Sequence, residues 1–112
     1  MEERISCKPV EVSDNFKESR QHIYDYTMDT FGYFQAERYL LQIDQPLARL
    51  TYFYPVHPEC RYLATKSRMY RNIILDAHLI IYRIAEERIE VLDIIHSASS
   101  IRKIRGIRNI HL

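Results

Sequence analysis

The stretch that decides the fold is YRNIILDAHLIIYRIAEERIEVLDIIH, residues 70–96, because β-branched and aromatic residues fill it in three short runs. The runs cover Tyr70–Leu75, His78–Ile84 and Arg88–Ile95, with Asp76-Ala77 and Ala85-Glu86-Glu87 between them. Such runs, separated by two or three residues, are typical of strands joined by short turns. The stretch therefore predicts a three-stranded antiparallel meander.

Two amphipathic helices are predicted on the N-terminal side of this meander. Ser13 is placed to cap the first helix, which extends to about Thr30 and is interrupted by Gly32. A short turn then forces the second helix to pack antiparallel to the first. We expect a bend or a restart at Pro46, because proline removes one helical hydrogen bond. The second helix should be buried against the sheet through an apolar stripe of Tyr33, Ala36, Leu40, Ile43, Leu47 and Leu50.

Three further segments complete the predicted order. Arg4–Val10 alternates weakly and contains Pro9, which suits a short edge strand. Tyr52–Cys60 has no period and is predicted to be the loop between helices and strands. Ser97–Ser100 can cap a basic segment with a frayed end. The predicted class is α+β: an N-terminal strand, an antiparallel helical hairpin and a meander, as one domain over residues 1–112 with a basic C-terminal segment from about residue 97.

Length and composition exclude several classes of protein. The chain has 112 residues, of which 28% are charged and 46% hydrophobic, so a multidomain enzyme and a disordered chain do not fit. The apolar run Leu79–Tyr82 is far shorter than the roughly 20 residues of a membrane span. Cys7 and Cys60 form neither a disulfide framework nor a zinc motif, which indicates a cytoplasmic protein.

No metal or cofactor is predicted. Two glycines in the whole chain cannot build a phosphate-binding loop. The chain has four histidines besides His96, namely His22, His57, His78 and His111. They show no metal-ligand spacing with one another or with either cysteine.

Charge is divided unequally along the chain. Residues 1–60 contain six Lys/Arg and ten Asp/Glu, a net charge of −4, whereas residues 61–112 contain ten and five, a net charge of +5. The C-terminal half is therefore expected to face an anion or an acidic partner.

Specific residues resemble a known family. The stretch Ile23–Thr27, followed by Gly32 and Ala36, is similar to the opening hairpin of ParE-like toxins in the RelE/ParE superfamily. Arg71 and the strands His78–Arg83 and Arg88–His96 resemble its closing signature, an arginine, "h-x-I-x-Y-R" and "R-I-x-I-L-x-I-x-H". The resemblance extends from about residue 5 to residue 104.

This resemblance implies a function and a partner. Its members are toxins of bacterial type II toxin–antitoxin modules, associated with growth inhibition and plasmid maintenance, and a cognate antitoxin neutralises each of them. ParE-like members inhibit DNA gyrase, whereas RelE-like members are ribosome-dependent mRNA endonucleases. Direct DNA binding is expected only through the antitoxin.

The nuclease alternative requires a base, an acid and cations around the phosphate. The candidates for these roles are His96, Tyr82, Arg71 and Arg83. His96 can equally satisfy a backbone group at a strand end, Tyr82 can be a core aromatic, and the arginines can cover the sheet. The residues predicted to contact a target are Arg71, Arg83, His96, Arg102, Lys103 and Arg105.

Two departures from the family pattern bear on the choice between these functions. The frequent "H-x-R-R-D" ending is replaced by His96-Ser97-Ala98-Ser99-Ser100, which leaves the target contacts there open and keeps an inert relative as an alternative. Between Gly32 and Cys60 only Arg38 and Arg49 are basic, so the lysine-rich helix of RelE-like nucleases is missing. We therefore expect a ParE-like gyrase inhibitor, with a RelE-like mRNA endonuclease and an inert antitoxin-binding relative as the alternatives.

Overall fold

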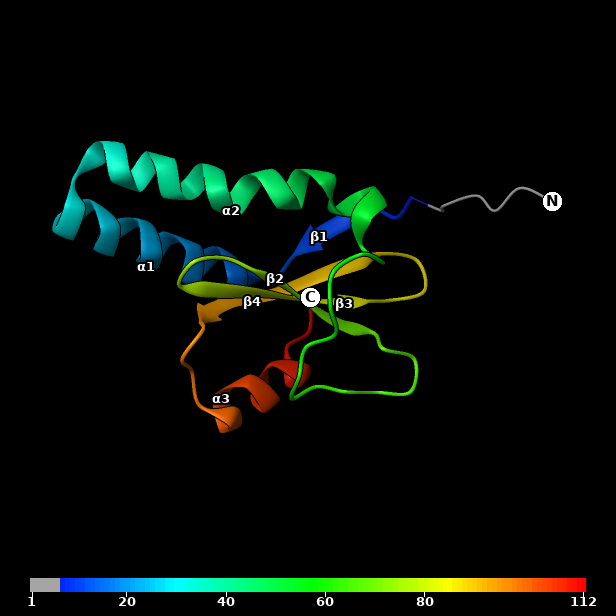
Figure 1. Cartoon of the computed structure of the whole chain (residues 1–112). Coiled ribbons are helices and arrows are strands. Elements are labelled where there is room, and N and C mark those ends of the chain that lie inside the picture. Colours follow the sequence, from blue (N-terminus) through cyan, green and yellow to red (C-terminus); the bar gives the residue numbers. More distant parts are fainter. Residues whose placement is uncertain (1–6) are drawn as a thin grey trace.

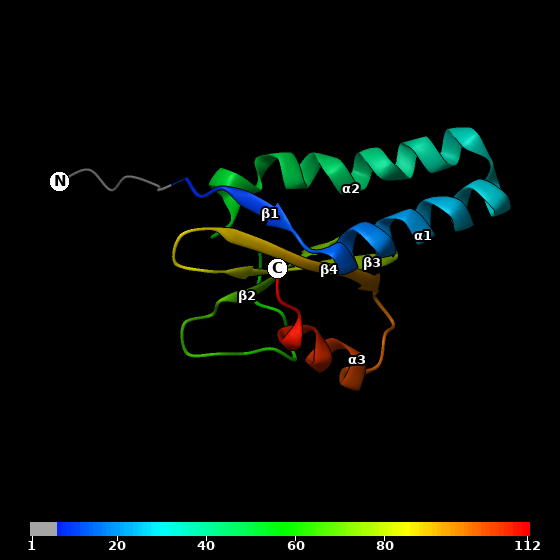
Figure 2. The same ribbon diagram turned by 180° about the vertical axis from the view of Figure 1, so that it is seen from behind.

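A four-stranded sheet lies between two layers in the computed structural model, which describes residues 7–112 (Figure 1). The α1/α2 hairpin covers one face of the sheet, and α3 lies on the other face (Figure 2). The predicted α+β class is confirmed. The elements are β1 (Val10–Val12), α1 (Asp14–Phe31), α2 (Tyr33–Phe53), β2 (Tyr70–Ile74), β3 (His78–Ile84), β4 (Ile89–His96), α3 (Ile101–Gly106) and the 3-10 turn η1 (Ile107–Asn109).

The sheet order is β1-β4-β3-β2, and the predicted meander is confirmed as the three antiparallel strands β2, β3 and β4. β1 adds to the sheet edge by pairing in parallel with β4, from Val10 opposite Ile89 to Val12 opposite Val91. The predicted placement of this strand at Arg4–Val10 is wrong for residues 7–9, and residues 4–6 lie outside the described part. Pro9 cannot donate a hydrogen bond, but its carbonyl accepts one from the Ile89 N–H, so the strand begins directly after it.

The helical hairpin follows its sequence signals closely. The Ser13 hydroxyl accepts a hydrogen bond from the Phe16 N–H and donates one to the Leu92 carbonyl, so the predicted cap also ties α1 to the sheet. Gly32 alone joins the two helices, with a φ of 89° that favours glycine. Arg20 on α1 makes a two-pronged ion pair with Asp44 on α2, which fixes the helices side by side.

Helix α2 continues without interruption through Pro46 to Phe53. The predicted restart is therefore wrong, while the predicted bend stays a prediction. The loop begins at Tyr54, two residues later than predicted. Pro46 lacks the N–H that would donate to the Gln42 carbonyl in a regular helix. Gln42 is exposed, so water can donate to that carbonyl instead.

The predicted stripe is confirmed for Ala36, Ile43 and Leu50, which are buried, and for Leu40 and Leu47, which are partly buried against the core. Its first member, Tyr33, is 58% exposed, so its predicted burial is wrong.

The sheet separates two apolar cores. Ile43 and Leu50 of α2 pack on the hairpin side with a set of sheet residues, among them Ile73, Ile80, Tyr82, Val91 and Ile94. On the opposite side, Ile81, Leu92 and Ile95 pack with Cys60, Leu63, Ile104 and Ile107. A β-bulge in β4 contributes to this division. The register passes from Ile81 opposite Asp93 to Tyr82 opposite Val91, so Leu92 is an extra residue without a partner on β3. Because of this extra residue, Val91 and Ile94 face the hairpin side while Leu92 and Ile95 face the opposite side.

The C-terminal segment is an ordered layer of the fold. Ser100 caps α3 by accepting a hydrogen bond from the Lys103 N–H, as expected. The expectation of a frayed end stays a prediction, but the middle of the segment is packed on the sheet, since Ile104 and Ile107 are 4% and 3% exposed. The reason is that isoleucines at a spacing of three residues fill one side of this segment and cover the sheet, while its cations point outward.

Candidate functional site

Tyr82 and Arg71 hold the chain where it leaves α2. The Tyr82 side chain is fully buried, and its hydroxyl donates to the Tyr54 carbonyl at 2.6 Å. Burial raises the pKa of this phenol. The neighbouring Arg71 guanidinium donates to the carbonyls of Arg68, Pro55 and His57 at 2.7–2.9 Å. Both side chains therefore have architectural roles in the described structure.

Arg83 lies on the opposite side of the sheet. Its side chain is 11% exposed and forms an ion pair of 2.7 Å with Glu90, which is 9% exposed. The same guanidinium reaches the carbonyls of Arg108 and Ile110, so it connects β3 to the C-terminal segment. Arg88 also pairs with Glu90 at 2.7 Å. Burial alone would raise the pKa of Glu90, but the hydrogen bonds from Arg83 and Arg88 bring it below its ordinary value.

The four candidates for a nuclease do not meet in one site. His96 pairs with His78 at one end of the β3–β4 ladder, and Tyr82 lies four residues further along β3. At about 3.3 Å per residue, this separates Tyr82 from the His78–His96 end by roughly 13 Å. Arg83 points to the other face of the sheet from Tyr82, because it bonds the C-terminal segment whereas Tyr82 packs in the core on the hairpin side. The structure therefore does not bring a base, an acid and phosphate-binding cations together at these residues.

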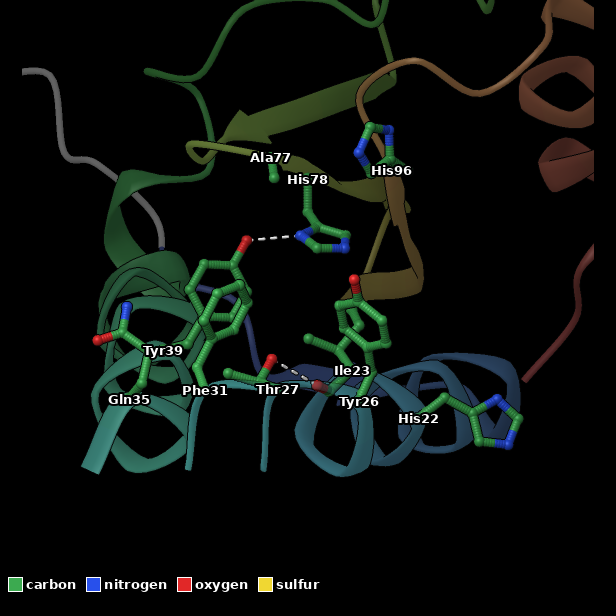
Figure 3. A pocket seen from close by; sticks show the side chains of 10 residues that line it. All are labelled: His22, Ile23, Tyr26, Thr27, Phe31, Gln35, Tyr39, Ala77, His78 and His96. Atoms are coloured by element: carbon green, nitrogen blue, oxygen red, sulfur yellow. Dashed lines mark hydrogen bonds between the residues drawn. The ribbon is translucent and has the colours of Figure 1, made fainter. Parts of the chain in front are cut away.

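His96 instead borders a groove of about 490 Å³ between the hairpin and the ends of β3 and β4 (Figure 3). Ile23, Tyr26 and Phe31 of α1 and Tyr39 of α2 supply most of its apolar wall. Tyr26 and Phe31 are each 66% exposed, which is unusual for aromatic side chains of a helix that also packs on a sheet. The remaining lining residues are His22, Thr27, Gln35, Ala77, His78 and His96.

The imidazoles at this groove have defined hydrogen-bond roles. The His96 Nδ1 accepts from the Ala98 N–H at 3.0 Å, so the neutral ring carries its proton on Nε2. The His78 Nδ1 is bonded to the Tyr39 hydroxyl, and the two imidazole rings lie 5.6 Å apart, edge to face. Burial, followed by the charge of His96, lowers the pKa of His78. The groove therefore ends in two adjacent imidazole rings whose Nδ1 atoms are both engaged in hydrogen bonds.

A second exposed feature is the basic surface of the C-terminal segment. Arg102, Lys103, Arg105 and Arg108 are all exposed, and within residues 7–112 none of their side chains has a carboxylate partner within 4 Å. Their backbone is anchored by Ile104 and Ile107. The predicted target contacts Arg102, Lys103 and Arg105 thus form one accessible surface, whereas Arg71 and Arg83 are engaged elsewhere and a target-binding role for them stays a prediction.

Neither a metal site nor a membrane span emerges from residues 7–112. No group of three or more His, Cys, Asp or Glu side chains in that range is arranged to hold an ion. None of the helices there combines the length and apolarity that crossing a bilayer requires.

Sequence reasoning missed the groove residues Tyr26, Tyr39 and His78. A signal was available in the aromatic residues Tyr26, Phe31, Tyr33 and Phe34, which crowd around Gly32 at the hairpin tip. More aromatic residues gather there than one buried stripe can accommodate. His78 gave no signal, since only the pairing of β3 with β4 places it beside His96.

Comparison with known proteins identifies the class. The family model for the ParE toxin of the type II toxin–antitoxin system parDE matches residues 10–101. The chain therefore belongs to the ParE toxin family. A search of characterised proteins by sequence gave no match.

A solved structure titled "Chromosomal ParDE TA system from P. aeruginosa" contains a chain with the same fold. The TM-score is 0.68 at 15% identity, over 81% of this chain and 97% of that one. The family match ends at Ile101, so most of the basic C-terminal segment lies beyond it.

Proposed function

We propose that this chain is the toxin of a type II toxin–antitoxin pair, that it acts in the bacterial cytoplasm by inhibiting DNA gyrase, and that its cognate antitoxin neutralises it. Membership of the ParE toxin family supports the toxin assignment and the antitoxin partner. The choice of a binder over a nuclease is carried by one observation. The Tyr82 hydroxyl is buried against a backbone carbonyl, about 13 Å along the ladder from His96.

The exposed cations of the C-terminal segment are the proposed contact with the target. Arg102, Lys103 and Arg105 project from a backbone that Ile104 and Ile107 anchor on the sheet, so little backbone entropy is lost when they engage an acidic surface. Exposed charges of this kind act mainly on association rate and orientation. Inhibition should therefore weaken as salt rises above about 0.1 M, where the screening length is about 10 Å.

The test compares two enzyme systems with the same purified chain. We expect inhibition of gyrase supercoiling and no cleavage of messenger on programmed ribosomes. Arg105→Glu should weaken gyrase inhibition about tenfold. The matched control Arg38→Glu, an exposed arginine on α2, should change it less than twofold.

Two results would reject parts of this proposal. Ribosome-dependent cleavage that His96→Gln abolishes would replace the gyrase inhibitor with the mRNA endonuclease. A chain that binds an antitoxin but affects neither enzyme system would be the inert relative.

A further inference from the structure

We propose that the chain binds the phosphate backbone of duplex DNA through an extended basic surface on the face of the sheet opposite the hairpin. This surface consists of the four exposed cations of the C-terminal segment together with Arg61, Lys66 and Arg68 of the loop that follows α2. The inference rests on the proposed function, because DNA gyrase holds duplex DNA as its substrate. It departs from the expectation that DNA is contacted only through the antitoxin.

The loop and the C-terminal segment form one layer of the fold. Both lie on the side of the sheet away from the hairpin, where the two opposite views show the loop next to the end of α3 (Figure 1, Figure 2). Leu63 of the loop packs in the same apolar core as Ile104 and Ile107. The cations of both segments are therefore carried by one framework, so little of the backbone has to be ordered when they bind.

The tip of the loop is a closed turn that presents its cations. The Arg68 N–H donates to the Thr65 carbonyl at 3.1 Å, which leaves the exposed Lys66 at the outside of the turn. Arg68 has a φ of 55°, a left-handed conformation that is uncommon for a residue with a side chain. The Arg71 Nε donates to the Arg68 carbonyl at 2.7 Å and so holds this turn. Arg71 is therefore a positioning residue for the loop.

The loop cations are accessible to an external anion. Within residues 7–112, neither Arg61 nor Lys66 has a carboxylate within 4 Å. Arg68 reaches Glu59 only at 3.9 Å, and its side chain stays 62% exposed. Together with the C-terminal segment, the loop therefore offers a row of cations that no internal anion neutralises.

Charge differs between the two sides of the sheet. Residues 59–69 and 97–112, which form this layer, contain seven Lys/Arg and one Asp/Glu. The hairpin, residues 14–53, contains four Lys/Arg and six Asp/Glu. A polyanion is therefore attracted to one face of the molecule and repelled by the other, which fixes the orientation of docking.

The side chains among the cations suit phosphate better than a protein partner. Protein interfaces depend on aromatic or other apolar anchors. In this layer, which is described throughout, the exposed large apolar side chains are Ile101 and Leu112. Ser67, Ser97 and Asn109 are exposed and can add neutral hydrogen bonds to phosphate oxygens.

A duplex fits this layer better than a single strand. Proteins hold single strands by stacking their bases on aromatic rings. Tyr62 and Tyr70 are partly buried here, and the guanidinium groups of Arg61 and Arg83 lie over their rings at 5.4 and 5.8 Å. Contacts with the backbone of a duplex need no free ring. They carry no sequence information, so binding should not depend on sequence.

The test is the fluorescence anisotropy of a fluorescein-labelled DNA duplex of about 20 base pairs, titrated with the purified chain at several salt concentrations. About five phosphate contacts predict that the logarithm of the association constant falls with the logarithm of the salt concentration with a slope of about −4 to −5. A second duplex of unrelated sequence should bind within twofold of the first.

Charge-reversal variants locate the surface. The double variant Arg61→Glu/Lys66→Glu should weaken DNA binding at least tenfold, and Arg105→Glu at least threefold. The matched control is the double variant Arg38→Glu/Arg49→Glu, because both are exposed arginines of α2 and the net charge changes by the same amount. It should weaken DNA binding less than twofold.

Equal losses in the two double variants, or a salt slope shallower than about −2, would overturn the extended basic surface. Tighter binding of a single DNA strand, or of an RNA duplex of the same sequence, would overturn the choice of duplex DNA.

A gyrase experiment separates this inference from the proposed function. Arg61→Glu/Lys66→Glu should weaken inhibition of supercoiling, but its binding to immobilised gyrase without DNA should stay within twofold of wild type. A matching loss of DNA-free binding would assign the loop to the gyrase protein and overturn the DNA contact. Absence of DNA binding alongside intact gyrase inhibition would reject this inference and leave the proposed function in place. DNA binding with the expected variant losses but without gyrase inhibition would do the reverse.

Discussion

Tyr82 in the centre of the sheet donates its hydroxyl hydrogen to the backbone carbonyl of Tyr54, one residue beyond the end of α2, at 2.6 Å. This bond joins two positions 28 residues apart in sequence. The hydroxyl of Tyr82, which was a candidate for catalysis, therefore has a structural hydrogen-bond partner.

Tyr82→Phe should therefore reduce stability and leave target inhibition intact at temperatures where the variant is folded. The ring still fills the core, so the loss is that of one buried hydrogen bond, about 0.5–1.5 kcal/mol. Urea unfolding followed by circular dichroism measures it, with exposed Tyr26→Phe as the control. Loss of activity with an unchanged unfolding midpoint would restore a chemical role to Tyr82.

Acid should destabilise the protein partly through Glu90. Hydrogen bonds from Arg83 and Arg88 keep its pKa in the folded state below the ordinary value, against the effect of burial. The unfolded chain therefore takes up this proton first, and the contribution of Glu90 is lost as the pH falls from about 4.3 through the lower folded value. Glu90→Gln should be less stable than wild type at pH 7, and the difference should shrink below pH 4.

The matched control for this pH series is Glu86→Gln, in the exposed turn between β3 and β4. Its stability curve should run parallel to that of the wild type from pH 7 to pH 3. A constant difference between wild type and Glu90→Gln over this range would mean that Glu90 is not the responsible group.

Ser13→Ala should cost more than an ordinary helix cap. The hydroxyl serves both the Phe16 N–H and the Leu92 carbonyl, and Ser13 is 2% exposed. A lost cap costs about 1 kcal/mol, and the second buried hydrogen bond adds about as much. We expect a loss of about 2 kcal/mol in thermal or urea unfolding. A loss below 0.5 kcal/mol, within the range of ordinary surface substitutions, would argue against the link between α1 and β4.

Ile104→Asp should unfold or aggregate the protein, because it places an unpaired carboxylate against Ile81, Leu92 and Ile95. Arg105→Asp, one residue later and exposed, should fold normally. Solubility and the near-ultraviolet spectrum of both variants provide the comparison. A soluble, cooperatively folding Ile104→Asp would show that the C-terminal layer is dispensable.

The elements that were predictable from sequence are those encoded by local signals. Ser13 and Gly32 delimit α1 nearly to the residue, because caps depend on the chemistry of single side chains. β3 has the bounds that its apolar run predicts. The parallel pairing of β1 with β4 was not predictable, since three residues carry no periodicity and their partner is distant. The restart predicted at Pro46 was wrong because local rules omit the packing that keeps α2 helical through it.

The candidate site was less predictable for the same reason. Sequence resemblance pointed to Arg71, Tyr82 and Arg83, but their tertiary partners give all three structural roles. Nothing in the sequence distinguishes a tyrosine that bonds a backbone carbonyl from one that meets a substrate. The basic segment was predictable as a charged surface, because four cations within seven residues stay in solvent unless anions pair with them.

The pairing of β1 with β4 also determines when the toxin can exist during its own synthesis. Ser13, directly after β1, must wait for Leu92, which the ribosome adds 79 residues later. At about 5–20 residues per second this delay is on the order of 4–16 s. Throughout that interval α1 and α2 have no completed sheet to cover. The hydrogen bond that ties α1 to the sheet therefore forms only after Leu92 has left the ribosome, seconds after the helix itself has been made.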